Sequence, residues 1–123
     1  LPMLAVLMVV CFGVLLLTEL TSNTATAATF LPITGALALS LGENPLLFLV
    51  PTALAANCSY MLPVGTPPNA IIYGSGIVPL AQMVRAGFLL NVILVPIVVG
   101  LLVWLGPMIF DLQAGVVPAW AQP

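Results

Sequence analysis

The sequence predicts an all-α membrane protein with a re-entrant helical hairpin, a discontinuous transmembrane helix and one full transmembrane helix. Of its 123 residues, 63% are hydrophobic and only 3% are charged, whereas an average soluble domain has about 25% charged residues. The mean hydropathy of +1.32 leaves too few polar residues to cover a soluble globule, so we expect most of the chain to face lipid. Two short polar or proline-rich stretches interrupt the apolar runs, and lipid tolerates such breaks only inside protein or beside a cavity.

The composition excludes several classes of function. Four charged residues give a net charge of −2 and provide no basic surface for nucleic acid. The chain has no histidine, and Cys11 and Cys58 are too far apart in sequence for a metal motif, so we interpret them as buried small hydrophobic residues. No nucleophile–base pair or metal cluster is present to suggest an enzyme. The first residues contain no basic segment, and we expect no signal peptide.

Residues 1–41 are expected to form the re-entrant hairpin. Residues 3–17 are uninterruptedly apolar, and as a helix they would reach about 22 Å, which is short for a full span but sufficient for one arm. Residues 18–24 carry four hydroxyl groups, one amide and one carboxylate. Residues 25–41 return to an apolar sequence rich in alanine, where small side chains allow helices to approach closely. The polar residues therefore form the tip of the hairpin.

Residues 42–81 are expected to form the discontinuous transmembrane helix. A turn at residues 41–45 leads into an apolar stretch, residues 46–61. Residues 62–69 contain Pro63, Pro67 and Pro68, and we predict that they are not helical because proline lacks an N–H donor and disfavours helix in the preceding residue. A short apolar segment, residues 70–79, follows. Such interrupted helices are typical of the binding sites of secondary transporters.

Residues 82–111 are expected to form the final transmembrane helix, and residues 112–123 a short tail. The apolar run at residues 86–110 would reach about 37 Å, which crosses a bilayer with some tilt. Arg85 is the only basic residue of the chain. By the positive-inside rule we expect Arg85 on the cytoplasmic side and Glu43 on the external side.

Each break offers partners for ions. A helix that ends within the membrane leaves carbonyl groups that attract a cation, and the helix that follows presents N–H groups that attract an anion. In the second break, Gly65 allows close approach of a ligand, Thr66 adds a hydroxyl group, and we expect Asn69 to cap the next half-helix. Alternatively, the hydroxyl groups bond back to their own helices and the prolines only introduce kinks.

Glu19 has two interpretations. A carboxylate at membrane depth is costly and indicates a functional role. It either binds a cation or accepts hydrogen bonds from N–H groups of the hairpin as a structural clamp. We favour the clamp, because a free negative charge would oppose an anion bound nearby.

The two breaks carry a family resemblance. Ser22, Asn23 and Thr24 form a Ser-Asn-Thr tip, and residues 62–71 read Leu-Pro-Val-Gly-Thr-Pro-Pro-Asn-Ala-Ile before a Gly-Ser-Gly at residues 74–76. Over residues 1–110 the chain resembles the divalent anion:sodium symporter family of the wider ion transporter superfamily. The resemblance implies half of an inverted-repeat transporter, here with the character of the C-terminal repeat, and hence part of a longer carrier.

The same resemblance implies roles for individual residues. A sodium ion would be bound by the backbone carbonyl groups of Thr18, Thr21 and Gly65 and by the side chain of Asn23. The substrate would contact four residues: Asn23, Thr24, Thr66 and Pro67. Three further residues are expected to support the site: Glu19, Ser22 and Asn69.

The function implied is secondary active transport, in which Na⁺ drives uptake of small divalent anions such as C4-dicarboxylates, with no other cofactor. The family also implies a homodimer with elevator-type movement, and we expect a multi-pass protein of the bacterial inner membrane. Two alternatives stay open. One is a carrier of sulfate, citrate or phosphate from the same superfamily, driven by Na⁺ or by protons. The other is a membrane-embedded accessory subunit that does not transport.

Overall fold

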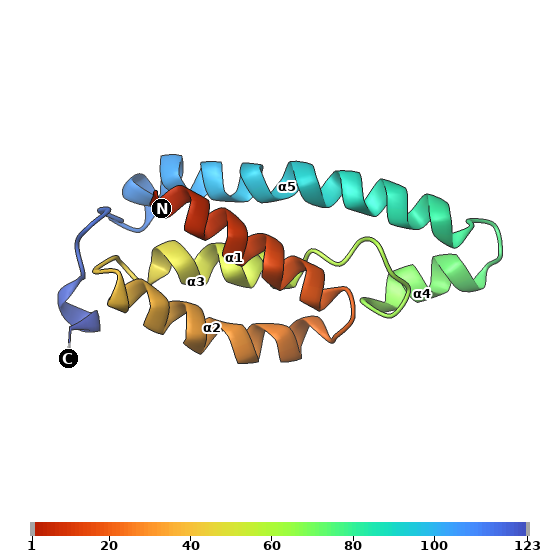
Figure 1. The fold of residues 1–123 in the computed structure, drawn as a ribbon, viewed down its shortest axis with the longest axis horizontal. Coiled ribbons are helices and arrows are strands. Elements are labelled where there is room, and N and C mark those ends of the chain that lie inside the picture. The colour runs from red at the N-terminus through yellow and green to blue at the C-terminus, as the bar shows by residue number, and fades with distance from the viewer. Residues whose placement is uncertain (1, 123) are drawn as a thin grey trace.

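The chain is helical in a computed structural model that describes residues 2–122. Five α-helices and one short 3₁₀ helix are present within this range, without any strand (Figure 1). Their bounds are α1 Met3–Thr18, α2 Asn23–Ser40, α3 Leu46–Ala56, α4 Pro67–Gly74, α5 Leu80–Ile109 and the 3₁₀ helix η1 Ala119–Ala121. The expectation of an all-helical chain is therefore confirmed.

The helices pack around the hairpin. Helices α1 and α2 are joined by residues 19–22, and α3 packs against both of them (Figure 1). Helix α4 continues beyond the end of α3, and α5 runs back along α1 and α3. Buried apolar side chains from these helices form one cluster, which includes Leu7, Leu15, Phe48, Val95 and Val99. This core fixes the place at which the two breaks meet.

The break between α3 and α4 lies earlier in the chain than the prolines predicted. Helix α3 ends at Ala56, and α4 begins at Pro67, so residues 57–66 are non-helical. The expectation that residues 67–69 are not helical was wrong. Pro67 and Pro68 occupy the first turn of α4, where backbone N–H groups have no partner within the helix and proline is tolerated.

Two other helices start before the expected residue. Helix α2 begins at Asn23 instead of residue 25, and α5 begins at Leu80 instead of residue 82. Gln82 and Arg85 are exposed in the first turns of α5. The polar tip of the hairpin is accordingly shorter than its sequence indicated.

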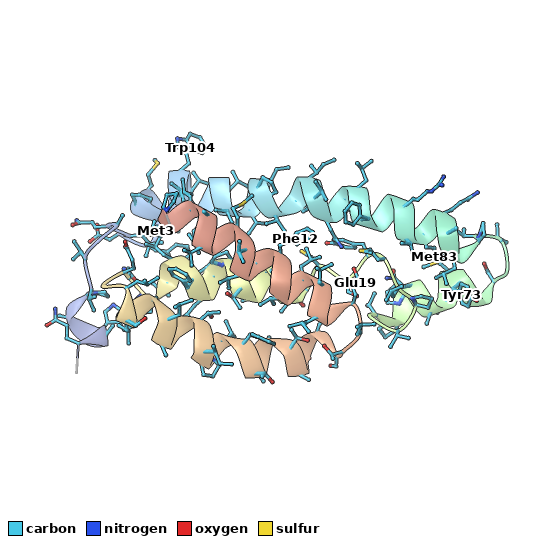
Figure 2. All side chains as sticks on the ribbon, viewed as in Figure 1. Met3, Phe12, Glu19, Tyr73, Met83 and Trp104 are labelled. Atoms are coloured by element: carbon cyan, nitrogen blue, oxygen red, sulfur yellow. The ribbon has the colours of Figure 1, made fainter. Side chains whose placement is uncertain are left out.

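One helix among residues 2–122, α5 (Leu80–Ile109), is long and apolar enough to cross a membrane. Helices α1 and α3 are also apolar but shorter. Large apolar side chains of α5 point away from the other helices; Trp104 is 70% exposed (Figure 2). An apolar exterior of this kind fits lipid or further protein segments better than water.

Candidate ion and substrate site

The tip of the hairpin brings three oxygen atoms together. The Thr18 hydroxyl group lies 2.7 Å from Oδ1 of Asn23 and also 2.7 Å from the carbonyl oxygen of Ala56. Thr18 is fully buried at the end of α1, Asn23 starts α2, and Ala56 ends α3. A hydroxyl group has one proton to donate, so it satisfies only one of the two acceptors at a time.

Three backbone carbonyl groups, at the end of α1 and in the two breaks, have no N–H donor in the described part of the chain. Within residues 2–122, no backbone N–H donates to the carbonyl oxygen of Thr18, Thr21 or Gly65. Thr18 and Gly65 are both buried. Buried carbonyl groups are nearly always paired, so this arrangement leaves acceptors that a cation would satisfy.

The start of α2 offers the opposite kind of partner. Ser22 is its N-cap residue but makes no side-chain capping bond. The N–H group of Thr26 donates to the Ser22 carbonyl at 2.9 Å, but the N–H groups of residues 23–25 before it have no backbone acceptor among the described residues. Free N–H groups at the start of a helix attract anions. Thr24, the second residue of α2, is exposed beside them.

The start of α4 differs. Thr66 is its N-cap, and Pro67 and Pro68 have no N–H to offer. The N–H groups of Asn69 and Ala70 both donate to the Thr66 carbonyl, at 3.1 and 3.3 Å. This helix start therefore provides the Thr66 hydroxyl group but no free N–H from its first turn.

Asn69 does not cap α4, because Thr66 occupies that position and Asn69 lies inside the helix. Its side-chain amide instead donates to the carbonyl oxygens of Ser59 and Leu62, at 3.0 and 3.1 Å. Asn69 thus folds the second break back against the helix that follows it.

Glu19 joins the two breaks. Its side chain is 2% exposed and lies at the inner end of the hairpin, beside the loop between α3 and α4 (Figure 2). The carboxylate accepts hydrogen bonds from five groups: the backbone N–H groups of Tyr60 at 2.8 Å, Met61 at 3.0 Å to each oxygen and Leu62 at 2.9 Å, the Ser59 hydroxyl at 3.3 Å and the Asn91 amide at 3.1 Å. Its donors belong to the second break and to α5, not to the hairpin as we expected.

Gly65 allows this contact to be close. A Cβ atom on Gly65 would overlap Oγ of Ser59 and would lie 3.2 Å from the Glu19 carbonyl oxygen. Any other residue would displace the Ser59 hydroxyl, which bonds to Glu19, and would crowd the Glu19 carbonyl. The structure therefore places Gly65 against Glu19, the residue that follows Thr18, and pairs Thr18 with Asn23. Thr24 and Thr66 lie at the starts of the two helices that follow the breaks.

A family model described as the sodium:sulfate symporter transmembrane region matches residues 1–112. The chain belongs to the divalent anion:sodium symporter family. It is 46% identical to the sodium-dependent dicarboxylate transporter SdcS of Staphylococcus saprophyticus over 112 residues, which are 91% of the chain and 21% of that relative. It is also 49% identical to SdcS of Staphylococcus aureus strain MRSA252 over 96 residues, 78% of the chain and 18% of the relative.

The chain thus spans about a fifth of the length of these symporters. The relatives are named as transporters, which agrees with the expectation that the chain is not an enzyme. Membership in this family also implies an integral membrane protein.

Several groups in the candidate site were missed by sequence reasoning. We did not expect the Ala56 carbonyl, the N–H groups of residues 60–62, or the Asn91 amide. One signal was available for Asn91. It is the only amide within the apolar run of residues 86–110, and a lone amide at membrane depth needs a polar partner.

Proposed function

We propose that this chain forms part of a sodium-coupled carrier of C4-dicarboxylates, in which it supplies one sodium site and one half of the substrate site. The observation that carries this proposal is the set of carbonyl oxygens without N–H donors at Thr18, Thr21 and Gly65, within the residues that the structure describes. At the same hairpin tip, the Asn23 side chain and the Ala56 carbonyl share the single hydroxyl proton of Thr18.

The sodium ion takes the three carbonyl groups and Oδ1 of Asn23 as ligands. These are hard, neutral oxygens, and the end of α1 adds the partial negative charge of a helix C-terminus. Glu19 is not a ligand, because N–H and O–H donors surround its carboxylate. The positive charge of the bound ion therefore stays available to attract an anionic substrate.

The substrate binds beside this ion. The free N–H groups at the start of α2 and the hydroxyl groups of Thr24 and Thr66 donate to its carboxylate oxygens, and Pro67 contacts it. Asn23 serves both ligands, because its carbonyl oxygen faces the ion while its NH₂ group donates to the anion. Ser22 and Asn69 support the two helix starts.

The choice of C4-dicarboxylates rests on the relatives, both of which are named sodium-dependent dicarboxylate transporters. Hydroxyl and N–H donors bind sulfate, citrate or phosphate by the same chemistry, so the donors themselves do not select among these anions.

The architecture follows from the lengths of the helices. In this proposal, residues 1–41 form a re-entrant hairpin, residues 42–81 a discontinuous transmembrane helix, residues 82–111 a full span and residues 112–123 a tail. Helix α1 has 16 residues, fewer than the approximately 20 that a full span needs. The complete carrier pairs this half with an inverted repeat in the lipid bilayer of the bacterial inner membrane and forms a homodimer.

Orientation is a separate part of the proposal. Arg85 faces the cytoplasm and Glu43 faces outward. The test is labelling of single cysteines at positions 85 and 43, in a background without Cys11 and Cys58, by an impermeant reagent added outside. Labelling at position 43 alone is expected, and labelling at position 85 alone reverses the orientation.

The function is tested with a chimera in which this chain replaces the matching region of the S. saprophyticus transporter. Reconstituted in proteoliposomes, the chimera is expected to accumulate labelled succinate only with external Na⁺, and competition with citrate, sulfate and phosphate ranks the substrates. If sulfate, citrate or phosphate inhibits uptake more strongly than unlabelled succinate, that anion is the substrate and the dicarboxylate assignment is wrong. A chimera that reaches the bilayer folded but transports none of these anions contradicts the proposal and favours the accessory subunit.

A further inference from the structure

Helix α5 contributes one polar side chain to the inside of the molecule close to the two breaks. Asn91 is 0% exposed, and its Nδ2 donates to Oε1 of Glu19 at 3.1 Å. Its Oδ1 is buried and has no hydrogen-bond partner among the described residues. A leucine at this position would fill a similar volume and bury no unpaired oxygen. What asparagine adds is therefore its N–H donation to Glu19.

The effect of the Asn91 hydrogen bond depends on the other groups that surround Glu19. A carboxylate has about four lone-pair sites, and the five donors around Glu19 make six contacts with its two oxygens. No acceptor position is left for a cation. Glu19 therefore acts on the site only through the groups that it holds, which are the Asn91 amide and the backbone and hydroxyl groups of residues 59–62.

Helix α5 contacts the same backbone segment a second time. Gly87 lies one turn before Asn91, and a Cβ atom there would come within 2.5 Å of the Tyr60 carbonyl carbon and 2.7 Å of Cα of Met61. Distances under about 3 Å do not occur for real Cβ atoms, and both atoms belong to backbone that cannot rotate away. The segment 60–62 is thus bonded to the Glu19 carboxylate and also packed against the bare backbone of α5 at Gly87.

We propose that Asn91 and Gly87 make α5 a positioning element of the sodium site, an inference that rests on the proposed function. Gly65 follows the held segment by three residues, and its carbonyl is one of the sodium ligands proposed above. Asn91 orients the carboxylate, the carboxylate fixes the N–H groups of residues 60–62, and Gly87 lets α5 support them from behind. Displacement of this segment moves the Gly65 carbonyl relative to the carbonyls of Thr18 and Thr21, and sodium binding weakens.

The test uses two pairs of variants in the chimeric carrier. Asn91→Leu removes the donor and keeps the volume, and its control is Asn57→Leu, because Asn57 is exposed and bonds only to the Ala53 carbonyl of its own helix. Gly87→Ala pushes α5 away from the second break, and its control is Gly100→Ala on the same helix, where an added Cβ meets nothing within 4 Å.

The measurements separate positioning from general stability. We expect Asn91→Leu to raise the Na⁺ concentration for half-maximal uptake about tenfold, which is the loss expected when the displaced Gly65 carbonyl no longer contacts the ion. Gly87→Ala is expected to raise it at least as much. The substrate KM at saturating Na⁺ should change little in Asn91→Leu, and its unfolding midpoint without Na⁺ should fall only as far as one lost buried hydrogen bond requires. Both controls should match the parent.

Each result supports or overturns the inference. If Asn91→Leu and Gly87→Ala keep the Na⁺ dependence of the parent and lose only unfolding temperature or maximal rate, α5 has a structural role alone. If the Gly87→Ala protein does not reach the bilayer, the Na⁺ dependence of Asn91→Leu alone tests the inference. A parent chimera without Na⁺-dependent uptake contradicts the proposed function as well, whereas a Na⁺-dependent parent with unaffected variants contradicts this inference only.

Discussion

The two breaks in the chain are held in different ways. Within the tip at residues 19–22, only Glu19 bonds to described residues outside the hairpin. The Thr21 hydroxyl donates to the Leu17 carbonyl at 2.9 Å and lies 2.5 Å from the Thr26 hydroxyl, both within the hairpin. The break at residues 57–66 is longer and is held largely from outside itself. Its backbone N–H groups bond to Glu19, and its carbonyls of Ser59 and Leu62 accept from Asn69.

The two breaks also offer different chemistry. The tip has both carbonyl groups at the end of α1 and free N–H groups at the start of α2. At the start of α4 the two prolines and the Thr66 carbonyl leave no free N–H in the first turn. We infer that the tip binds both the cation and the anion, whereas the second break completes the cation site and adds one hydroxyl group. A proline-rich break need not repeat the role of a polar tip.

The largest effect is expected from Glu19→Gln, which breaks the link between the two regions. A glutamine places an NH₂ group where N–H donors converge, so at least one buried donor of the second break loses its acceptor. We expect the free energy of unfolding to fall by at least about 2–3 kcal/mol, because unpaired buried donors cost about 1–3 kcal/mol each. Thermal and denaturant unfolding of the chimera in lipid nanodiscs measures the loss.

Glu43→Gln is the matched control. Glu43 accepts one N–H, that of Gly115 at 2.6 Å, in a partly exposed turn at the other end of the hairpin. We expect Glu43→Gln to lower the free energy of unfolding by less than about 1 kcal/mol. Equal losses for the two variants would show that the convergence of donors on Glu19 has no special weight.

The presence of both breaks could be predicted from the sequence, but the contacts that connect them could not. Hydroxyl-rich and proline-rich segments are local signals, so the tip near Asn23 and a break before α4 were predictable. The donors to Glu19 lie 40 to 72 residues away in the chain, and which of them reach the carboxylate depends on how three helices pack. Gly87 gave no signal, because the backbone that it contacts is distant in sequence. The end of α3 at Ala56 was missed, because residues 57–61 include no proline.

Asn23→Ala is expected to have a smaller effect on the fold but a large effect on the function of the tip. The variant removes one sodium ligand and one donor to the substrate while the carbonyl groups of α1 remain. A lost hydrogen bond to a charged ligand costs about 1.5–3 kcal/mol, or more than about tenfold in affinity. Sodium-coupled succinate uptake by the chimera should be abolished, with the unfolding temperature nearly unchanged.

The control for this variant is Asn57→Ala, which removes an exposed amide that bonds within its own helix. It should transport like the parent. If Asn23→Ala keeps the sodium dependence of the parent, the tip does not couple sodium to the substrate, and the two breaks do not share the roles inferred above.

The smallest effects are expected from the two N-cap residues, which compare the breaks most directly. Neither Ser22 nor Thr66 makes a side-chain capping bond, so alanine at either position should change stability by less than the approximately 1 kcal/mol typical of a lost cap. Their effects on substrate binding should differ. Thr66 is the only donor of the α4 start, and Thr66→Ala should raise the substrate KM by about tenfold, the lower end of the range for one hydrogen bond to a charged ligand.

Ser22→Ala should raise the substrate KM less, because the N–H groups at the start of α2 remain to bind the anion. Initial rates of succinate uptake at saturating Na⁺ give both values, and unfolding in nanodiscs gives the two stabilities. A larger rise in KM for Ser22→Ala than for Thr66→Ala would contradict the comparison, because the tip would then bind the anion through its side-chain hydroxyl group and not through its backbone. If both variants match the parent, the second break contributes to the cation alone, and the substrate contacts of this half of the carrier lie entirely at the hairpin tip.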